Sequence, residues 1–282
     1  MNVSVVIPTY NGKHLLEKNL PDVLLAIRQD DEVIIVDDAS SDDTVSWVKN
    51  TYPKIRVVQN SKNLRFALSC NRGVQTAIHE IIILLNNDVS PKKDFLEHLL
   101  VHFKDEKVFA VGCKEIATNE DGKEFGRNGG KFMRGFLVHW REEYQDGTQT
   151  LWVSGGSGAF RKSMWEHLGG FDPDYRPAYW EDIDLSWRAR KKGWKVLFEP
   201  KSLVYHNHES TNTNVFGKNQ MEVMAYKNQI LFMWKNAKGV ELLKHFLWLP
   251  YHLFFTSIRS NGRFLRGFLA ALTQYFFPRF SQ

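Results

Sequence analysis

The sequence predicts an α/β protein in which helices cover both faces of a mostly parallel, twisted sheet. Two observations predict this class. Short apolar runs alternate with segments of helical spacing over residues 1–113, as in βαβ units. Polar clusters follow three of the apolar runs, at 8–11, 37–43 and 86–88. In a parallel sheet these strand ends share one edge, and ligands bind in the crevice beside that edge.

The individual elements are predicted from the period of their apolar residues. Runs too short for a helix predict strands, and apolar residues three or four positions apart predict helices. The polar, glycine-rich stretch 114–150 predicts a flap or hairpins, and 152–161 predicts a strand or turn that other groups approach closely. The expected strands are 3–8, 32–36, 55–59, 81–85, 108–113, 195–198 and 203–205, and the expected helices are 14–28, 44–50, 71–78 and 95–103.

Length and charge divide the chain into two parts. A chain of 282 residues with 43% hydrophobic residues is long enough for a sizeable core and an appendage. We expect a catalytic domain at 1–215 and a basic helical tail at 216–282. The tail holds nine Lys or Arg and two Glu, which gives it a net charge of +7. Because the whole chain has a net charge of +5, residues 1–215 have a net charge of −2. A mildly acidic catalytic part favours a divalent cation and argues against a nucleic-acid groove.

The two cysteines, Cys70 and Cys113, give neither a disulfide framework nor a metal cluster. The first ten residues lack the pattern of a signal peptide, because they already form an apolar strand. Both observations predict a protein with reduced thiols in the cytoplasm.

A dense group of acids flanked by two tryptophans lies at 180–188. If this segment opens a helix, Glu181 and Asp182 lie in its first turn, where the helix dipole favours ionised carboxylates. A carboxylate held there and facing a pocket is a candidate general base for a hydroxyl group. The alternative is an N-terminal capping role.

Asp37 and Asp38 follow the second strand. A carboxylate at this position can accept hydrogen bonds from a nucleobase or from ribose hydroxyls. The alternative is a cap for the next helix, which Ser41 or Asp42 can supply alone. The sequence therefore favours a binding role for the two spare carboxylates.

A metal site is expected where Asn86, Asn87 and Asp88 follow the most apolar strand, because a carboxylate there is an oxygen ligand for Mg²⁺ or Mn²⁺. His206 and His208 are two residues apart on an extended segment, so at most one of them faces the site. His206 is preferred because it directly follows a strand. The alternatives are a loop cap for the carboxylate and structural hydrogen bonds for the histidines.

Several catalytic signatures are missing from the sequence. It has no His-Glu-x-x-His, P-loop or nucleophile elbow. No Gly-x-Gly-x-x-Gly follows the first strand, which argues against a dinucleotide oxidoreductase. The candidate chemistry is therefore confined to the strand ends and to the acids at 181–182.

Seven different short motifs follow one another between residues 3 and 182. They are VSVVIPTYN at 3–11, VDDAS at 36–40, NLRFALSCNRG at 63–73, LNNDV at 85–89, GGSGAFR at 155–161, GGFD at 169–172 and ED at 181–182. In order and spacing they resemble glycosyltransferase family 2, and most closely its rhamnosyltransferase-like branch, which builds bacterial surface polysaccharides. The resemblance covers about residues 1–210. It implies a GT-A fold and an inverting, metal-dependent transfer from a nucleotide-diphospho-sugar to a lipid-linked or polysaccharide acceptor.

The resemblance also implies roles for single residues. Asp182 matches the family's general base, with Glu181 beside it. Asp88 matches the second acid of its Asp-x-Asp motif for Mg²⁺ or Mn²⁺, and His206 falls near a third metal contact. The implied donor-binding residues are Pro8, Tyr10, Asn11, Asp37, Asp38, Asn63, Arg65, Asn71 and Asn87, and the acceptor-side residues are Gly155, Gly156 and Trp180.

Two positions depart from the family pattern. Asn86 replaces the first acid of the metal motif and leaves Asp88 to carry the metal largely alone. Arg65 stands where many relatives have Gly, so its guanidinium either contacts a diphosphate or acidic acceptor or is merely exposed. Asn86 lends slight support to an alternative, a non-catalytic sugar-nucleotide-binding or assembly protein. A sugar-phosphate nucleotidyltransferase is a second alternative, but the first loop, 8–12, lacks the basic phosphate cradle it needs.

The tail combines basic residues with Trp, Phe and Leu at helical spacing. Its apolar stretch 246–255 contains Pro250 and His252 and is shorter than the roughly 20 residues that span a bilayer. We therefore expect an amphipathic anchor on the inner face of the cell membrane. The alternative is a helical subdomain that packs on the catalytic domain or on a second copy of the chain in a homodimer.

Overall fold

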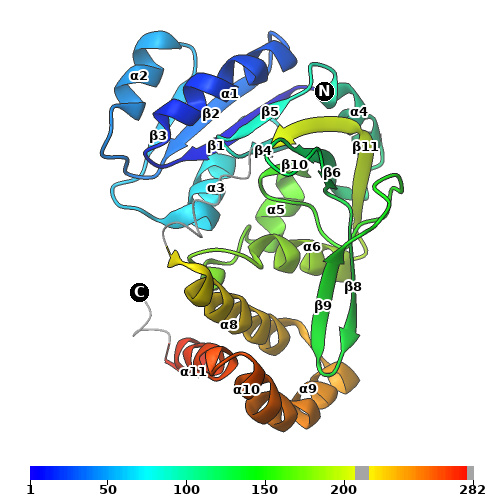
Figure 1. The fold of residues 1–282 in the computed structure, drawn as a ribbon. Helices are drawn as coiled ribbons and strands as arrows, with labels where there is room; N and C mark the ends of the chain where they lie inside the picture. Colours follow the sequence, from blue (N-terminus) through cyan, green and yellow to red (C-terminus); the bar gives the residue numbers. More distant parts are fainter. Residues whose placement is uncertain (207–215, 278–282) are drawn as a thin grey trace.

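The computed structural model describes residues 1–206 and 216–277. In Figure 1 the large sheet and its helices form the upper part, and a layer of helices lies below it. The strands are β1 (Val3–Thr9), β2 (Glu32–Asp37), β3 (Arg56–Gln59), β4 (Ile81–Leu85), β5 (Val89–Pro91), β6 (Val108–Ala117), β7 (Glu124–Phe125), β8 (Asn128–Met133), β9 (Phe136–Arg141), β10 (Ser157–Arg161) and β11 (Lys195–His206).

The helices fall into two sets, those beside the sheet and those after residue 216. The first set is α1 (Lys13–Ala26), α2 (Thr44–Thr51), α3 (Arg65–Thr76), α4 (Phe95–Leu100), α5 (Lys162–Leu168) and α6 (Glu181–Lys191), with 3₁₀ turns at Val101–Lys104 and Pro173–Tyr175. The second set is α8 (Lys218–Asn236), α9 (Gly239–Tyr251), a π-helical turn (His252–Thr256), α10 (Ser257–Arg259) and α11 (Arg263–Phe276). In the described part of the chain, no helix is both long and apolar enough to span a membrane.

The large sheet has the order β3-β2-β1-β4-β10-β6-β11-β5, with β7 attached to β6. Strands β1 to β4 pair in parallel, as do β6 and β11, whereas β10 runs antiparallel between β4 and β6. Thr9 and Asp37 are register partners at the carboxyl ends of β1 and β2. Ser157, the first residue of β10, pairs with Leu85, the last residue of β4. The carboxyl ends of the parallel strands and the start of β10 therefore meet at one rim.

Both faces of this sheet are buried, which explains why its strands read as continuous apolar runs. Val5 faces the core under α1, α2 and α4, where Leu20 is buried. Val6 points to the opposite face and packs in the core under α3, α5 and α6, where Leu185 is buried. Successive strand residues alternate in this way because the side-chain period of a strand is two.

The expected α/β architecture is confirmed, and some elements differ in extent. Helix α3 begins at Arg65, six residues before the expected start, because the distant Asp38 accepts the N–H groups at its N-terminus. The two late strands form one strand, β11, with an irregular register between Glu199 and Leu203. The stretch 114–150 contains the hairpin β8–β9, as expected.

A third core joins the helices after residue 216 to the rest of the protein. Ile230 and Phe232 of α8 are fully buried, and they pack in one cluster with Tyr175, Trp180 and Ile183. The ring of Phe232 lies 5.2 Å from that of Trp180, measured between centroids. Helix α8 therefore packs directly against the segment that leads into α6.

Candidate active site

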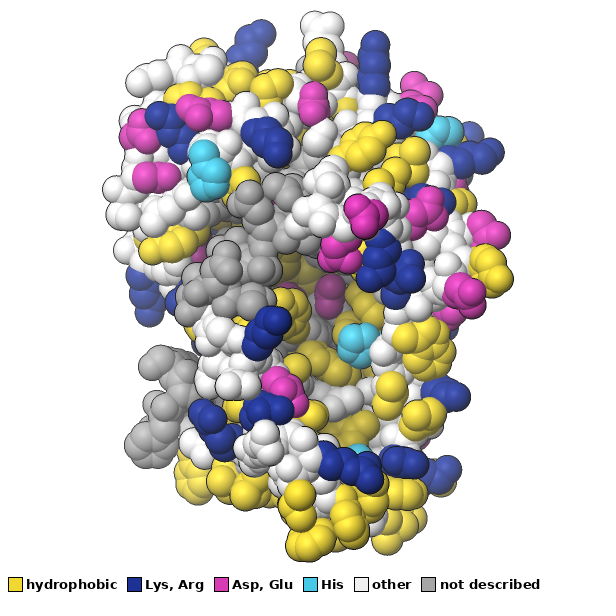
Figure 2. Space-filling model, viewed as in Figure 1, with side chains coloured by type: hydrophobic (Ala, Val, Ile, Leu, Met, Phe, Trp, Pro, Cys, Tyr) yellow, Lys and Arg dark blue, Asp and Glu magenta, His cyan; other side chains and the backbone are white. Residues whose placement is uncertain are grey.

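A cleft of about 510 Å³ lies off the rim where β1, β2 and β4 end. It is bounded on the other side by the residues before β10 and before α6. In Figure 2 the surface is hollowed between the part that carries the sheet and the helical part below it. The cleft is lined by eleven of the residues expected from the sequence, namely Pro8, Tyr10, Asn11, Asp38, Asn63, Arg65, Asn87, Gly155, Gly156, Glu181 and Asp182.

A wider depression of about 690 Å³ lies near the start of β6 and β11 and contains none of the expected residues. Several of its titratable side chains are already paired. Lys195 lies 2.6 Å from a carboxylate oxygen of Asp105, and His102 lies 2.6 Å from Glu199. Of these two cavities, the smaller one brings together carboxyl groups from distant parts of the chain, those of Asp38, Glu181 and Asp182.

Asp38 anchors the side of the cleft that is formed by the loops after β1 and β2. Its side chain is almost fully buried and accepts backbone N–H groups of Leu64 at 2.7 Å and Arg65 at 2.8 Å, together with the amide of Asn60 at 2.8 Å. These contacts hold the segment 60–65 against the end of β2. Asp42 accepts the N–H of Thr44, the first residue of α2, at 3.1 Å, and, among the described residues, Asp38 makes no contact with this helix start.

Asn11 ties the loop after β1 to the loop after β2. Its side-chain oxygen accepts the N–H of Ser41 at 2.7 Å, and its own N–H donates to the hydroxyl of Ser40 at 2.8 Å. The φ angle of Asn11 is 47°, in the left-handed region that Asn tolerates better than most residues. The loop conformation therefore depends on an asparagine at this position.

Arg65 lies at the start of α3 with a φ angle of 69°, which explains why a glycine is easily accommodated there. Besides Asp38, the backbone N–H of Arg65 also donates to the side-chain oxygen of Asn63, at 3.1 Å. The guanidinium is exposed and lies 5.6 Å from the ring centre of Phe216. Arg65 therefore reaches from the side of the cleft that Asp38 anchors toward the start of the helical layer.

Asp88 lies directly beyond the lining residue Asn87, and it contacts His206 at the end of β11. The distance from the Asp88 carboxylate to His206 Nε2 is 3.1 Å, and His206 Nδ1 lies 3.0 Å from Glu115. Glu115 in turn accepts a hydrogen bond from Ser157. Burial would lower the pKa of His206, but the two carboxylates outweigh it and raise that pKa to about 10.

This group fits a divalent cation that has few protein ligands. A carboxylate and an imidazole nitrogen are suitable donors for Mn²⁺, and a metal-bound histidine commonly has a carboxylate on its other nitrogen, as Glu115 is here. His206 Nε2 and the Asp88 carboxylate face each other at 3.1 Å and would be the two protein ligands of such a cation. Within residues 1–206 and 216–277 no three acidic, His or Cys side chains form a metal site by themselves. His208 lies outside the described residues.

Glu181 and Asp182 are the first two residues of α6 and line the cleft. Burial raises the pKa of Asp182 to about 6, although the N–H groups of Ile183 and Gly155 favour its ionised form. Burial, and then the charge of Asp182, raise the pKa of Glu181 to about 8. One oxygen of Glu181 is buried with no hydrogen-bond partner among the described residues. Both pKa values are raised because the two carboxyls are buried side by side, and the rise is larger for Glu181, so Asp182 is the more acidic of the two.

Gly155 and Gly156 lie where a side chain has no room. A Cβ on Gly156 would lie 2.6 Å from the side-chain nitrogen of Asn86, and one on Gly155 would lie 2.8 Å from the ring of Phe171. The carbonyl of Gly156 also accepts the N–H of Asn86 at 2.9 Å. This close approach holds the end of β4 against the segment that precedes β10.

The segment before α6 is held by α8. The side-chain amide of Asn228, which is fully buried, donates to the carbonyl oxygens of Tyr175, Ala178 and Tyr179 at 2.8–2.9 Å. Tyr179 and Trp180 have φ angles of 71° and 80°, and such left-handed backbone is strained for bulky residues. Asn228 therefore stabilises the strained backbone that positions Glu181 and Asp182.

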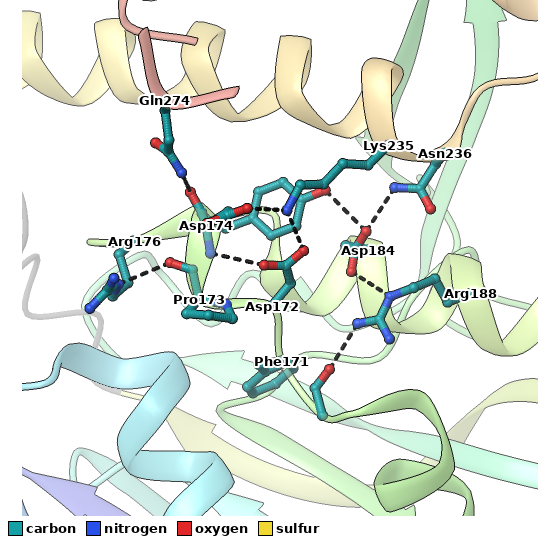
Figure 3. A network of polar contacts seen from close by, with 12 residues as sticks. Phe171, Asp172, Pro173, Asp174, Arg176, Asp184, Arg188, Lys235, Asn236 and Gln274 are labelled. Atoms are coloured by element: carbon teal, nitrogen blue, oxygen red, sulfur yellow. Dashed lines mark hydrogen bonds and ion pairs between the residues drawn. The ribbon is translucent and has the colours of Figure 1, made fainter. Parts of the chain in front are cut away.

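Figure 3 shows a polar network that joins the same elements. Lys235 of α8 donates to Asp172 at 2.6 Å and also contacts Asp174. Asn236 donates to Asp184 of α6 at 2.7 Å, and the same carboxylate binds Arg188 at 2.7 Å. The network ties α8 to the first turn of α6 through Asp184 and to the segment before α6 through Asp172 and Asp174.

Five of the expected residues do not line the cleft. Asp37 is buried and accepts the N–H of Ser40 at 3.3 Å. Asn71 holds the backbone of Phe171 through two hydrogen bonds of 2.8 Å. Trp180 is buried in the third core, whereas Asp88 and His206 contact each other beside the cleft. Their binding roles stay predictions.

Sequence reasoning missed three side chains of this region, Glu115, Asn228 and Tyr179. Glu115 lies two residues beyond the expected end of its strand, and only the longer β6 reveals that it faces His206. Asn228 lies in the middle of an amphipathic helix and has no local signal. Tyr179 lines the cleft, and its place just before the acidic pair was an available signal.

Comparisons with known proteins agree with this architecture. The model of the family described as "Glycosyl transferase family 2" matches residues 4–169. The chain is similar to the O-antigen chain rhamnosyltransferase RfbN of Salmonella typhimurium, at 27% identity over 77% of this chain and 69% of that protein. It is also similar to the N-acetylglucosaminyl-diphospho-decaprenol L-rhamnosyltransferase of Mycobacterium tuberculosis, at 25% identity over 74% of this chain and 76% of that protein.

Among solved structures, the mannosyltransferase PcManGT from Pyrobaculum calidifontis, in complex with GDP-Man and Mn²⁺, aligns with a TM-score of 0.61 and 18% identity. The alignment covers 98% of this chain and 87% of that one. At this identity the likeness bears on the fold alone, and it confirms the expected GT-A fold. Since the family model matches more than half of the sequence, the chain belongs to glycosyltransferase family 2.

Proposed function

We propose that this glycosyltransferase moves a sugar from a nucleotide-diphospho-sugar to a hydroxyl group of a lipid-linked or polysaccharide acceptor, with inversion at the anomeric carbon. One observation carries the proposal: Asp38, Asn87 and the pair Glu181–Asp182 line a single cleft although they are far apart in the sequence. The names of the relatives support a role in glycan synthesis, and one of them acts on a diphospho-decaprenol compound.

The donor is proposed to lie along the rim formed by β1, β2 and β4. Pro8, Tyr10 and Asp38 would contact the base and ribose, because they lie at the carboxyl ends of adjacent parallel strands. Asn63 and Arg65 lie at the start of α3, where the exposed guanidinium of Arg65 favours anionic phosphate. This arrangement would orient the diphosphate toward Asp88.

Asp88 and His206 would hold Mg²⁺ or Mn²⁺, with diphosphate oxygens and water as the remaining ligands. When bound, the cation supplies positive charge that stabilises the diphosphate leaving group. Glu115 would hold the imidazole of His206 in place through Nδ1. The solved structure of PcManGT contains Mn²⁺ together with its donor, which supports the same arrangement here.

Asp182 would act as the general base. It would take the proton from the acceptor hydroxyl as that oxygen attacks the anomeric carbon, and the bond from this carbon to the diphosphate oxygen would break in the same step. A single displacement of this kind inverts the configuration. Glu181, which keeps its proton at neutral pH, would donate a hydrogen bond to orient the acceptor.

The substitution Asp182→Asn tests this proposal. We expect transfer to fall by about 10²–10⁴-fold, because Asn cannot accept the proton. Donor binding, measured by thermal shift with Mn²⁺, should stay unchanged. In the unmodified enzyme the rate should fall as the pH drops below about 6, since Asp182 then becomes protonated. Asp146→Asn, an exposed carboxylate outside the cleft, is the matched control.

Two results would reject parts of the proposal. Unchanged turnover of Asp182→Asn would remove Asp182 as the base and favour the alternative of a sugar-nucleotide-binding protein without catalysis. Full activity in the presence of a chelator would rule out the role of Asp88 and His206 in metal binding. Release of free diphosphate from a nucleoside triphosphate and a sugar phosphate would indicate the other alternative, a nucleotidyltransferase.

We also propose that the protein acts at the inner face of the cell membrane, where a lipid-linked acceptor would be available. The basic, aromatic-rich composition of 216–282 supports this location. Its division into a catalytic part at 1–215 and a membrane-associating part at 216–282 is part of the same proposal.

A further inference from the structure

Large exposed apolar side chains are concentrated in one region of the molecule, which runs from α9 through the π-helical turn and α10 to α11. Figure 2 shows them gathered along the lower edge of the molecule, over the helices at the bottom of Figure 1. Six of these side chains, each more than half exposed, define what we call the docking face. They are Val240, Leu243, Leu247, Phe254, Ile258 and Leu269.

The docking face follows from the helical spacing of its residues. Val240, Leu243 and Leu247 lie three and four positions apart, so they share one side of α9. The opposite side of α9 packs inward through His245, which is fully buried and contacts the carbonyl of Gly135 at 2.9 Å. Helix α9 therefore buries a polar side chain and exposes apolar ones, which is the reverse of an ordinary surface helix.

Cations surround the docking face. Lys238, Lys244 and Arg259 are exposed and have no ion-pair partner within the described parts of the chain. Glu241 is the one acid among residues 237–277. Figure 2 shows a row of Lys and Arg side chains directly above the apolar edge.

A second part of the chain adds to this cationic border. The turn of the hairpin β8–β9 carries Arg134, whose guanidinium lies 5.9 Å from the ring centres of both Trp248 and Tyr251. The hairpin and α9 are therefore in direct contact. Because Arg134 lies in the middle of the chain, the composition of the tail alone does not reveal its contribution.

Exposed apolar side chains bordered by unpaired cations fit an anionic lipid bilayer better than a second copy of the chain. In a symmetric dimer through this face, the unpaired cations of one copy would face those of the other, and such contacts repel. A bilayer accepts the apolar side chains below the headgroups and places anionic headgroups beside the cations.

We propose that the docking face inserts into the interfacial layer of an anionic membrane, with Lys244, Arg259 and Arg134 bound to lipid headgroups. This deepens the proposed membrane location by assigning it to α9–α11 and the hairpin tip and by excluding α8, which is committed to the core beside the active site. The assignment rests on the proposed function only for its biological purpose, because lipid binding needs no sugar transfer.

Vesicle sedimentation of the full chain tests the proposal. We expect binding to vesicles of phosphatidylglycerol and phosphatidylcholine, and at least tenfold weaker binding to phosphatidylcholine alone. The double variant Leu247→Glu with Phe254→Glu should weaken binding to the mixed vesicles by about tenfold or more. Both side chains are exposed, so the variant should keep the thermal stability of the parent.

Matched controls separate the face from general surface chemistry. Leu25→Glu changes an equally exposed leucine of α1, and it should bind like the parent. Lys244→Gln with Arg259→Gln should weaken binding to anionic vesicles several-fold. Lys18→Gln with Lys54→Gln removes the same charge from exposed positions outside the face and should have little effect.

Three results would overturn the proposal. The first is equal binding by the parent and by Leu247→Glu with Phe254→Glu. The second is an equal loss of binding in the Leu25→Glu control. The third is a dimer in vesicle-free solution that Leu247→Glu disrupts, together with no vesicle binding by the parent. A chain that binds vesicles through this face but transfers no sugar would reject the proposed function and leave the docking face supported.

Discussion

The two walls of the cleft are built in different ways. The donor wall consists of the loops that directly follow β1, β2 and β4, and its residues are near neighbours through the register of the sheet. The base wall, named for its proposed role, consists of the segment 172–182. It is held by side chains of α8 that lie 49 to 63 residues later in the chain. The comparison teaches that the base wall is supported from outside, whereas the donor wall is supported by its own strands.

This difference predicts a large stability cost for changes in α8. Phe232 is fully buried between Trp180 and Trp187, with ring-centre distances of 5.2 Å and 5.8 Å. Phe232→Ala should lower the free energy of unfolding by about 3–5 kcal/mol, because it leaves a cavity under the base wall. Chemical denaturation measures this value.

The matched control for Phe232→Ala is Leu247→Ala in α9, which should change the free energy of unfolding by less than about 0.5 kcal/mol because Leu247 is exposed. A cost below about 1 kcal/mol for Phe232→Ala would mean that α8 is not part of the cooperative core. The helices after residue 216 would then be an appendage, and the comparison between the two walls would fail.

A smaller effect, confined to turnover, is expected when the hydrogen bonds of α8 are removed. Asn228→Ala leaves three backbone carbonyls of the segment 175–179 without their donor. The strained backbone at Tyr179 and Trp180 should relax and displace Asp182, so we expect kcat to fall by roughly tenfold to a hundredfold. The affinity for the donor should stay within about twofold of the parent.

Asp38→Asn should give the opposite pattern. The amide cannot accept the N–H groups of Leu64 and Arg65 as the carboxylate does, so donor affinity should fall by about tenfold while kcat changes less. Steady-state kinetics over a range of donor concentrations separates the two cases. If both variants changed KM alone, the two walls would not have separate roles.

The sequence predicted the donor wall better than the base wall for a physical reason. A buried strand with a polar cluster at its end is a local pattern, and β1, β2 and β4 all have it. The early start of α3 was missed because its capping carboxylate, Asp38, comes from another loop, 26 residues away. The acidic pair was found because Glu181 and Asp182 are adjacent in the sequence.

The side chains that hold the segment before Asp182 and the imidazole of His206 were also missed because they lie far away in the sequence. Asn228 acts on carbonyls about 50 residues away, and nothing in its own helix marks it. Glu115 contacts His206 across 91 residues through the pairing of β6 with β11. A sequence pattern identifies groups that perform chemistry more readily than the distant side chains that hold them.

The last prediction concerns the proton held by Glu181. Its pKa rises from about 4.5 in the unfolded chain to about 8 in the folded protein, because it is buried beside Asp182. Between these values the folded state holds a proton that the unfolded state has released, so stability falls as the pH rises from about 5 to 8 and levels off above that. Glu181→Gln removes this titration. We therefore expect the Tm of the variant to match that of the parent near pH 5 and to exceed it clearly at pH 8.5. Parallel Tm curves for the two proteins would show that Glu181 is ionised at neutral pH, and it would then repel Asp182 instead of donating a hydrogen bond to the acceptor.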